Sequence, residues 1–251
     1  MSEPVYDQIG AGYATRRQPD PRIAAAILEA IGDAHRILNV GAGSGSYEPR
    51  DREVLAVEPS ATMIEQRPPG SAPCVQGTAE ALPVEDKSFD CAMAILTIHH
   101  WSNWRQGLDE MRRVADRAVI LSFEPDFPDF WLTRDYLPEA RELDRRTCPS
   151  PAEIVQHFGT GEIDVLPIPH DCIDGFHGAY WRRPEQYLDP EVRRSISTFA
   201  RIATSARALE RLAADLENGA WHRRNAALLA LTSCDVGYRL IRADFSQQRA
   251  T

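Results

Sequence analysis

The sequence lacks several features that would each point to a particular class of protein. It has only five cysteines, scattered and without a Cys-x-x-Cys pair, which argues against a zinc site and favours reduced thiols. No apolar run approaches the roughly 18 residues of a membrane-spanning helix, and residues 1–4 lack the basic and apolar regions of a signal peptide. Basic residues number 28 against 37 acidic ones, which disfavours a general nucleic-acid or anionic-membrane binder. We therefore expect a cytoplasmic protein without a metal, a membrane or a nucleic-acid partner.

The chain is long enough for one large domain. Its 251 residues are 43% hydrophobic, and a chain of this length buries about 70–75% of its unfolded surface on folding. No internal repeat, low-complexity tract or long flexible linker divides it. We expect residues 1–251 to form a single domain, as a monomer or a homodimer.

A glycine-rich turn follows the first apolar run. Residues 36–40 are typical of a strand buried on both faces of a parallel sheet. Gly41, Gly43 and Gly45 then stand at alternate positions, where glycine permits positive φ and a close approach of a ligand to the backbone. A strand that ends in such a turn offers N–H groups to an anionic ligand. A tight turn without a ligand is the competing interpretation.

An acidic residue ends the next apolar run. Residues 54–57 are followed by Glu58, and a carboxylate at this strand tip can accept hydrogen bonds from a ribose diol. The dinucleotide fingerprint requires a third glycine where this chain has Ser46. A dehydrogenase is therefore disfavoured.

A Gly-x-Gly-x-Gly turn with an acidic residue at the next strand end resembles the class I S-adenosylmethionine-dependent methyltransferases, of the methyltransferase type 11 kind. Three later landmarks follow in the family's order: Ala-Glu-x-Leu-Pro at 79–83, Ser-Phe-Asp at 88–90 and His-His-Trp at 99–101. The resemblance covers residues 37–123. It implies an α/β fold: a Rossmann-like, seven-stranded, mostly parallel sheet with helices on both faces and a helical cap.

The resemblance also implies which residues bind S-adenosyl-L-methionine and its product S-adenosyl-L-homocysteine. They lie on the segment before the first helix, on the glycine turn, and at the ends of the second, third and fourth strands. These residues are Tyr13, Arg22, Asn39, Gly41, Ala42, Gly43, Ser44, Gly45, Glu58, Pro59, Met63, Thr78, Ala79, Glu80, Leu96 and Thr97.

The chain departs from the family pattern in three places. Asn39 stands where the family more often has an acidic residue, and Thr78 stands where most relatives have an aspartate at the adenine. Glu48-Pro49 interrupts the chain soon after the glycine turn, so we expect only a helical stub of one or two turns there. Competing roles for Tyr13 and Arg22 are aromatic packing and a solvated cation.

Helical spacing begins near the N-terminus and returns in the second half. Asp20 and Pro21 are a helix start, apolar residues follow over 23–31, and Gly32 is a helix end. Apolar residues from Val192 to Leu216 also have helical spacing. We expect a core from about 23–123, 151–170 and 236–246, and a cap from 124–150 and 175–235 that carries substrate specificity.

Two histidines are candidates for a general base, which is needed when the methyl acceptor must lose a proton. His99 and His100 follow the fourth strand, at the sheet edge where open α/β folds bind ligands. We choose His100 as the base and His99 as a substrate contact. A structural histidine beside Trp101 is the alternative.

The second half holds two further groups of interest. His170, Asp171, Asp174 and His177 have no recognised metal-ligand spacing, so no metal is expected. Phe127, Trp131 and Trp181 are candidates to line an apolar substrate pocket, and a plain apolar core in the cap is the alternative.

These observations predict a methyltransferase that acts on a small-molecule oxygen, nitrogen or carbon, with an apolar or aromatic acceptor. The alternative is a non-catalytic protein that binds the cofactor or serves as a scaffold, suggested by Asn39. A tRNA methyltransferase is disfavoured by the net charge of −9.

Overall fold

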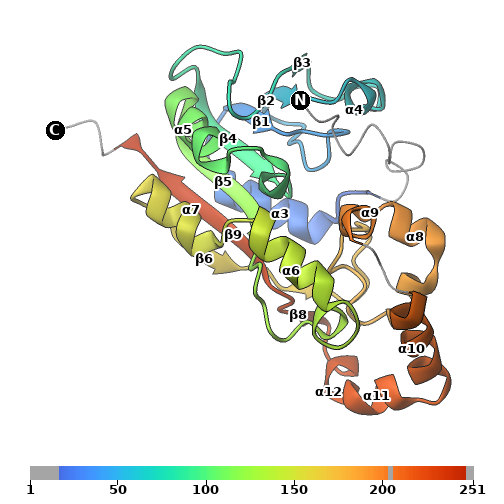
Figure 1. Cartoon of the computed structure of the whole chain (residues 1–251). Helices are drawn as coiled ribbons and strands as arrows, with labels where there is room; N and C mark the ends of the chain where they lie inside the picture. Colours follow the sequence, from blue (N-terminus) through green and yellow to red (C-terminus); the bar gives the residue numbers. More distant parts are fainter. Residues whose placement is uncertain (1–16, 203–205, 247–251) are drawn as a thin grey trace.

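The computed structural model describes residues 17–202 and 206–246 (Figure 1). Its main sheet has seven strands in the order β3-β2-β1-β4-β5-β9-β6. The strands are β1 Arg36–Val40, β2 Glu53–Glu58, β3 Cys74–Gln76, β4 Phe89–Ile95, β5 Ala115–Phe123, β6 Glu162–Val165 and β9 Tyr238–Asp244. Strands β1 to β5 pair in parallel, and β9 runs antiparallel to both of its neighbours, β5 and β6. The predicted seven-stranded, mostly parallel sheet is confirmed.

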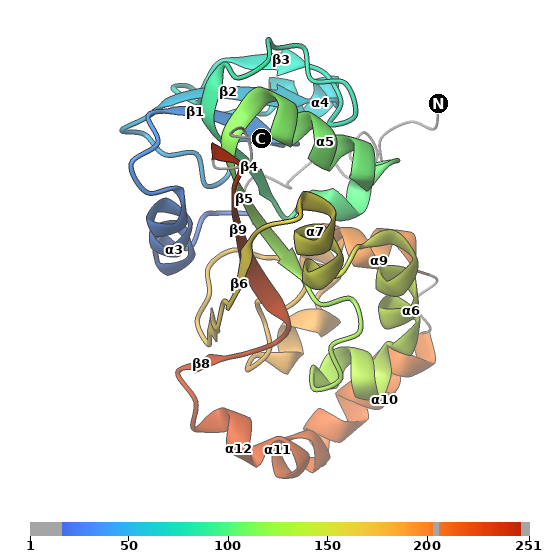
Figure 2. The ribbon, with the colours of Figure 1, turned by 90° about the vertical axis from the view of Figure 1, so that its left-hand side faces the viewer.

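Alternate residues of the central strands pack against different helices. Cys91 and Met93 of β4 share a core with the apolar face of α3 (Pro21–Ile31), whereas Ala92 and Ala94 share one with α5 (Trp104–Val114) and α7 (Pro151–Phe158). Figure 2 shows α3 on one side of the sheet and α5 and α7 on the other. This two-sided burial explains why the central strands are continuous apolar runs.

Helix α3 forms as its sequence predicts. The Asp20 side chain accepts from the amide of Arg22, and Pro21 occupies the first helical position. Isoleucines 23, 27 and 31 lie on one buried face. Gly32, with φ of +65°, then ends the helix.

The structure corrects one local expectation. The predicted helical stub does not form in residues 41–52, because Tyr47 adopts a φ of +64° and Pro49 follows directly after Glu48. Strand β4 ends at Ile95, because Leu96 turns the chain with a φ of +53°. Strand β6 ends at Val165, and residues 168–169 pair with 233–234 as a separate two-stranded sheet, β7 (Ile168–Pro169) and β8 (Ser233–Cys234).

Helical segments gather at one end of the sheet (Figures 1 and 2). They are η1 Ile98–His100, η2 Leu132–Tyr136, α6 Pro138–Thr147, η3 Pro184–Leu188, α8 Pro190–Arg194, α9 Ser197–Arg201, α10 Ala206–Glu217, α11 Ala220–Arg224 and α12 Ala226–Leu229. A further helix, α4 (Ala61–Glu65), contacts β2 and β3. The apolar pattern of 192–216 is therefore divided among α8, α9 and α10, since Ile196 is extended between α8 and α9. Within the described ranges, no helix is both long and apolar enough to cross a membrane.

Candidate active site

Glu58 is held in a fixed orientation at the carboxyl end of β2. Its side chain is 4% exposed. One carboxylate oxygen accepts from the Gly43 amide at 2.8 Å, and the other accepts from the Ser60 amide at 3.0 Å. The acidic strand tip and the glycine turn are thus one hydrogen-bonded unit.

The glycine turn lies close to the end of β4. Gly41, Gly43 and Gly45 all have positive φ. A Cβ on Gly41 would lie 2.2 Å from the Thr97 hydroxyl, whereas a Cβ on Gly43 would meet only the terminal methyl of Met63, at 3.4 Å. Gly41 is therefore required by close packing within the protein, and Gly43 mainly by its backbone conformation.

Most of the predicted cofactor residues come together here. Those at or directly after the carboxyl ends of β1, β2 and β4 are Gly41, Ala42, Gly43, Ser44, Gly45, Glu58, Pro59, Met63, Leu96 and Thr97. Exposed Thr78 follows Gly77, whose amide donates to the Glu58 carbonyl at 3.2 Å, and Ala79 is buried against the α5 side of the sheet.

Asn39 has a structural partner that explains its departure from the family pattern. Its amide donates to Glu48 at 3.0 Å. Glu48 is paired with Arg67 at 2.7 Å, and both side chains are almost fully buried. An aspartate at position 39 would place a second carboxylate against Glu48, whereas the asparagine amide donates to it.

Two other predicted residues, Glu80 and Arg22, are paired with neighbouring groups. The Glu80 carboxylate accepts from Ser102 and from the Asn103 amide, at the start of α5. Arg22 is half exposed and pairs with Asp20 and Asp171. Each of these charged groups is hydrogen-bonded or ion-paired to other residues of the chain. Tyr13 lies outside the described residues.

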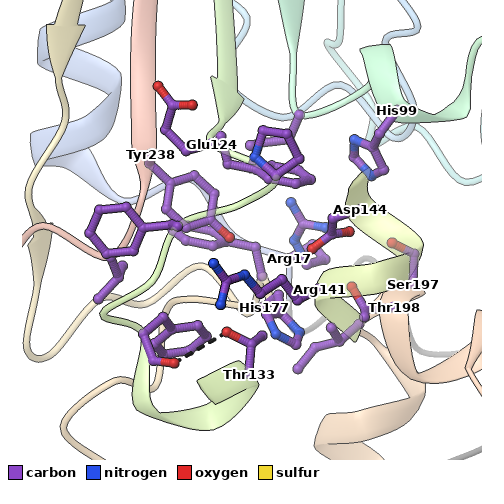
Figure 3. A pocket seen from close by; sticks show the side chains of 18 residues that line it. Arg17, His99, Glu124, Thr133, Arg141, Asp144, His177, Ser197, Thr198 and Tyr238 are labelled. Carbon is purple, nitrogen blue, oxygen red and sulfur yellow. Dashed lines mark hydrogen bonds between the residues drawn. The ribbon is translucent and has the colours of Figure 1, made fainter. Parts of the chain in front are cut away.

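A pocket opens beside the end of β4, under the helical segments (Figure 3). Its apolar wall includes Leu96, Phe123, Phe127, Phe130, Phe176, Ile196, Val236 and Tyr238. Its polar wall includes Arg17, His99, Glu124, Thr133, Arg141, Asp144, His177, Ser197 and Thr198. The pocket thus combines aromatic walls with a few polar groups, as small-molecule sites do.

Two histidines face this pocket with buried nitrogens that have no hydrogen-bond partner among residues 17–202 and 206–246. These are Nδ1 of His99 and both ring nitrogens of His177. Burial lowers the pKa of His177 to about 4 and holds the pKa of His99 well below its usual value. Nearby His100, Arg201 and Arg17 lower the His99 pKa further. Both imidazoles are therefore neutral at physiological pH.

Asp144 contributes a carboxyl group to the same pocket. Burial raises its pKa to about 7, against the opposing effect of Arg201. In the view of Figure 3 the Asp144 carboxyl lies between His99 and His177. A carboxyl with this pKa can exchange a proton near neutral pH.

Of the predicted base and substrate residues, His99 and Phe127 line the pocket and three others do not. His100 is not among the lining residues, and its ring centroid lies 3.9 Å from that of His99. Burial lowers the pKa of His100 to about 3. Trp131 and Trp181 are fully buried, and their indole N–H groups donate to the carbonyls of Trp181 and Ile168. The prediction that these tryptophans line the pocket is not met, because their rings and N–H groups are satisfied inside the core.

The cluster of residues 170–177 separates in the structure. Asp174 is fully buried and accepts from Arg17 at 2.6 Å and from the Tyr47 hydroxyl at 2.9 Å, while His177 faces the pocket. Within residues 17–202 and 206–246 no three potential metal ligands lie together.

Arg17 and Asp144 belong to the pocket but were not predicted. They come from the start of the described chain and from α6, far apart in sequence. The local sequence signal for Asp144 is that it is a carboxylate on the amphipathic helix α6. Arg17 has no comparable local signal.

Comparison with known proteins identifies the fold and the family. Residues 38–123 match the family model of a methyltransferase domain. An uncharacterized methyltransferase of Bacillus subtilis is 33% identical over 121 residues, which are 44% of this chain and 44% of that protein. A phosphoethanolamine N-methyltransferase of Haemonchus contortus, in complex with S-adenosyl-L-methionine, has a TM-score of 0.55 at 13% identity. That match covers 96% of this chain and 56% of the Haemonchus chain, and it shows the fold alone.

A fuller match comes from a putative methyltransferase from an antibiotic biosynthesis pathway of Anabaena variabilis. Its crystal structure has a TM-score of 0.82 and 36% sequence identity, over 91% of this chain and 98% of that one. The similarity includes the segments beyond residue 123 that the family model does not reach. The chain belongs to the class I S-adenosylmethionine-dependent methyltransferases.

Proposed function

We propose that the protein transfers a methyl group from S-adenosyl-L-methionine to a small molecule held in the pocket beneath the helical segments. The observation that carries this proposal is the position of the pocket. Leu96 and His99 both line the pocket. Thr97, between them, packs against Gly41 of the glycine turn. A cofactor at the turn and an acceptor in the pocket would therefore be neighbours.

The residues at the glycine turn fit this cofactor. The buried Glu58 carboxylate is oriented by two amides, as a ribose diol requires. The positive φ of Gly43 leaves its side of the turn clear except for the flexible end of Met63. When bound, S-adenosyl-L-methionine supplies a methyl group already activated by a sulfonium.

The chain's own contribution is to position the acceptor and to exclude water. Methyl transfer requires the nucleophile and the methyl carbon in line, within about 3–3.5 Å, in a dry site. The aromatic side chains of Phe123, Phe127 and Phe130 form much of the apolar wall. These rings support an apolar or aromatic acceptor.

Two further observations support a small-molecule acceptor. The Anabaena relative is described as part of an antibiotic biosynthesis pathway, and antibiotics are small molecules. The acidic excess of this chain, 37 acidic against 28 basic residues, is unfavourable for binding the phosphates of a nucleic acid.

The test has two stages. Calorimetric titration with S-adenosyl-L-methionine should show binding to one site per chain. A screen of aromatic and apolar small molecules should then release S-adenosyl-L-homocysteine. Glu58→Ala should abolish or weaken both signals, whereas Glu53→Ala, at the exposed start of the same strand, should change neither. Cofactor binding without turnover of any acceptor would instead support a non-catalytic protein.

A further inference from the structure

We propose that the pocket accepts a molecule with a hydroxyl group on an aromatic or conjugated ring, and that Asp144 removes the hydroxyl proton. This inference rests on the proposed function, because it assigns the acceptor class and the base within the same site. It is carried by two polar side chains on the pocket wall, His177 and Asp144, for which the described part of the chain provides no hydrogen-bond partner.

His177 gives the first indication of a hydroxyl group. Both of its ring nitrogens are buried without a hydrogen-bond partner in the part of the chain that the structure describes, and the side chain faces the pocket. A neutral imidazole carries one donor and one acceptor, and a hydroxyl group can satisfy either. Leaving buried polar atoms unpaired is unfavourable. A ligand that completes these hydrogen bonds is therefore favoured over a purely apolar one.

Asp144 supplies the proton acceptor. It lies on α6, which packs against η1, the segment that carries His99. Among the described residues no hydrogen bond is formed by its carboxylate, although it borders the pocket. The residue is thus placed to accept a hydrogen bond from a bound molecule.

The surrounding charges favour an oxygen nucleophile over a cationic amine. Arg17 and Arg201 lower the pKa of His99, and Arg201 of α9 also opposes the rise in the pKa of Asp144. The titratable groups that share the pocket with Asp144, or lie near it, also include His99, Arg17, Glu124, Arg141, His177, Tyr238 and Cys148. The charge of Arg17 is paired with buried Asp174, so the cation near Asp144 that favours a developing oxyanion over an ammonium group is Arg201.

The walls and the basicity of Asp144 indicate an aromatic hydroxyl. Phe127 and Phe130 can pack against a flat ring. A carboxylate whose pKa is raised to about 7 is better matched to a phenol than to the much less acidic hydroxyl of an alcohol.

The reaction is balanced without any further reagent. The O–H bond of the acceptor breaks, and its proton passes to the Asp144 carboxylate. An oxygen lone pair forms the new bond to the methyl carbon, and the electrons of the broken carbon–sulfur bond remain on sulfur as a neutral thioether. Asp144 later returns the proton to solvent.

Binding to the S-adenosyl-L-homocysteine complex gives a first test. Phenol should bind at least about tenfold more tightly than benzylamine, which is cationic at neutral pH, and more tightly than aniline. Equal or tighter binding of either amine, or no binding of phenol, would overturn the proposal. A failure to bind S-adenosyl-L-homocysteine itself would instead count against the proposed function.

Turnover provides the second test, with phenol and the more acidic 4-nitrophenol as acceptors. Asp144→Asn should lower kcat for phenol by about 100-fold or more, and much less for 4-nitrophenol, which ionises without a base. The wild-type rate for phenol should rise with pH through about 7, where Asp144 loses its proton. If Asp144→Asn lowers kcat equally for phenol and for 4-nitrophenol, the role of Asp144 is structural and the assignment is overturned.

The matched control is Glu142→Gln on the same helix. Its side chain is 60% exposed, and the substitution makes the same carboxylate-to-amide change. It should leave both rates and the pH profile unchanged. Equal losses of kcat in Asp144→Asn and Glu142→Gln would show that a disturbance of the helix, and not the loss of the Asp144 carboxylate, lowers turnover.

Discussion

The Glu58 carboxylate accepts a hydrogen bond from the backbone amide of Gly43 at 2.8 Å. This contact joins the end of β2 to the turn that follows β1. The group expected to hold the ribose therefore also holds the glycine turn. A substitution at Glu58 should affect both the ligand contact and the geometry of the turn.

Replacement of Glu58 by alanine should weaken the binding of S-adenosyl-L-homocysteine by about 1.5–3 kcal/mol, the range for charge-assisted hydrogen bonds. That loss corresponds to about 10- to 150-fold in Kd. Calorimetry gives the affinity, and circular dichroism confirms that the fold is intact. An unchanged Kd in a folded variant would remove Glu58 from the ribose site.

The glycine turn allows a comparison between two positions with similar backbone. A side chain in the left-handed region costs about 1–2 kcal/mol, so both Gly41→Ala and Gly43→Ala should reduce the free energy of unfolding. Gly41→Ala should cost more, because its Cβ would also collide with Thr97. Urea denaturation measures both losses, and equal losses would contradict the close packing at Gly41.

A larger side chain at Gly43 tests the ligand contact itself. Gly43→Val should retain most secondary structure but lose measurable cofactor binding, because the valine occupies space on the ligand side of the turn. Gly43→Ala serves as the control for backbone strain alone. Normal binding by the valine variant would show that the turn is only structural.

Trp181 and Phe127 should behave differently although both were predicted at the substrate. Trp181 is fully buried, so Trp181→Ala should reduce stability by about 3–5 kcal/mol. Phe127 lines the pocket, so Phe127→Ala should mainly raise KM for the acceptor while cofactor affinity stays within about twofold. Thermal unfolding and steady-state kinetics separate the two effects. A stable Trp181→Ala variant with impaired turnover would restore the tryptophan to the substrate site.

Asp144 should make stability depend on pH in a direction opposite to that of a paired carboxylate. Its pKa is raised from 3.8 to about 7, so between these values the native state keeps a proton that the unfolded state releases. Stability should therefore fall as the pH rises from about 4 to 7, by on the order of 4 kcal/mol from this group. Asp144→Asn should lack this fall. Urea denaturation at several pH values measures it, and parallel profiles for both proteins would contradict the raised pKa.

Local sequence signals were sufficient for the framework of the fold. Continuous apolar runs predicted the central strands because both faces of a parallel sheet are covered. Asp20 marked a helix start because its side chain accepts from the amide two residues ahead, as the structure shows. The glycine turn and Glu58 could be paired because parallel strands end at the same edge.

The contents of the pocket depended on contacts between distant segments. Asp144 and His99 lie 45 positions apart, and His177 comes from a third segment, so no periodic pattern relates them. The sequence also could not decide whether Trp131 and Trp181 belong to the core or to a pocket wall, because aromatic side chains occur in both environments.

The sequence by itself determined the sheet, its glycine turn and the family, because these depend on the chain's immediate neighbours and on a shared order of motifs. Only the tertiary structure decided which polar groups face the pocket. Their burial and hydrogen-bond partners are set by segments that meet after folding. Asn39 donates to Glu48, which is paired with Arg67, whereas the buried ring nitrogens of His177 have no hydrogen-bond partner among the described residues.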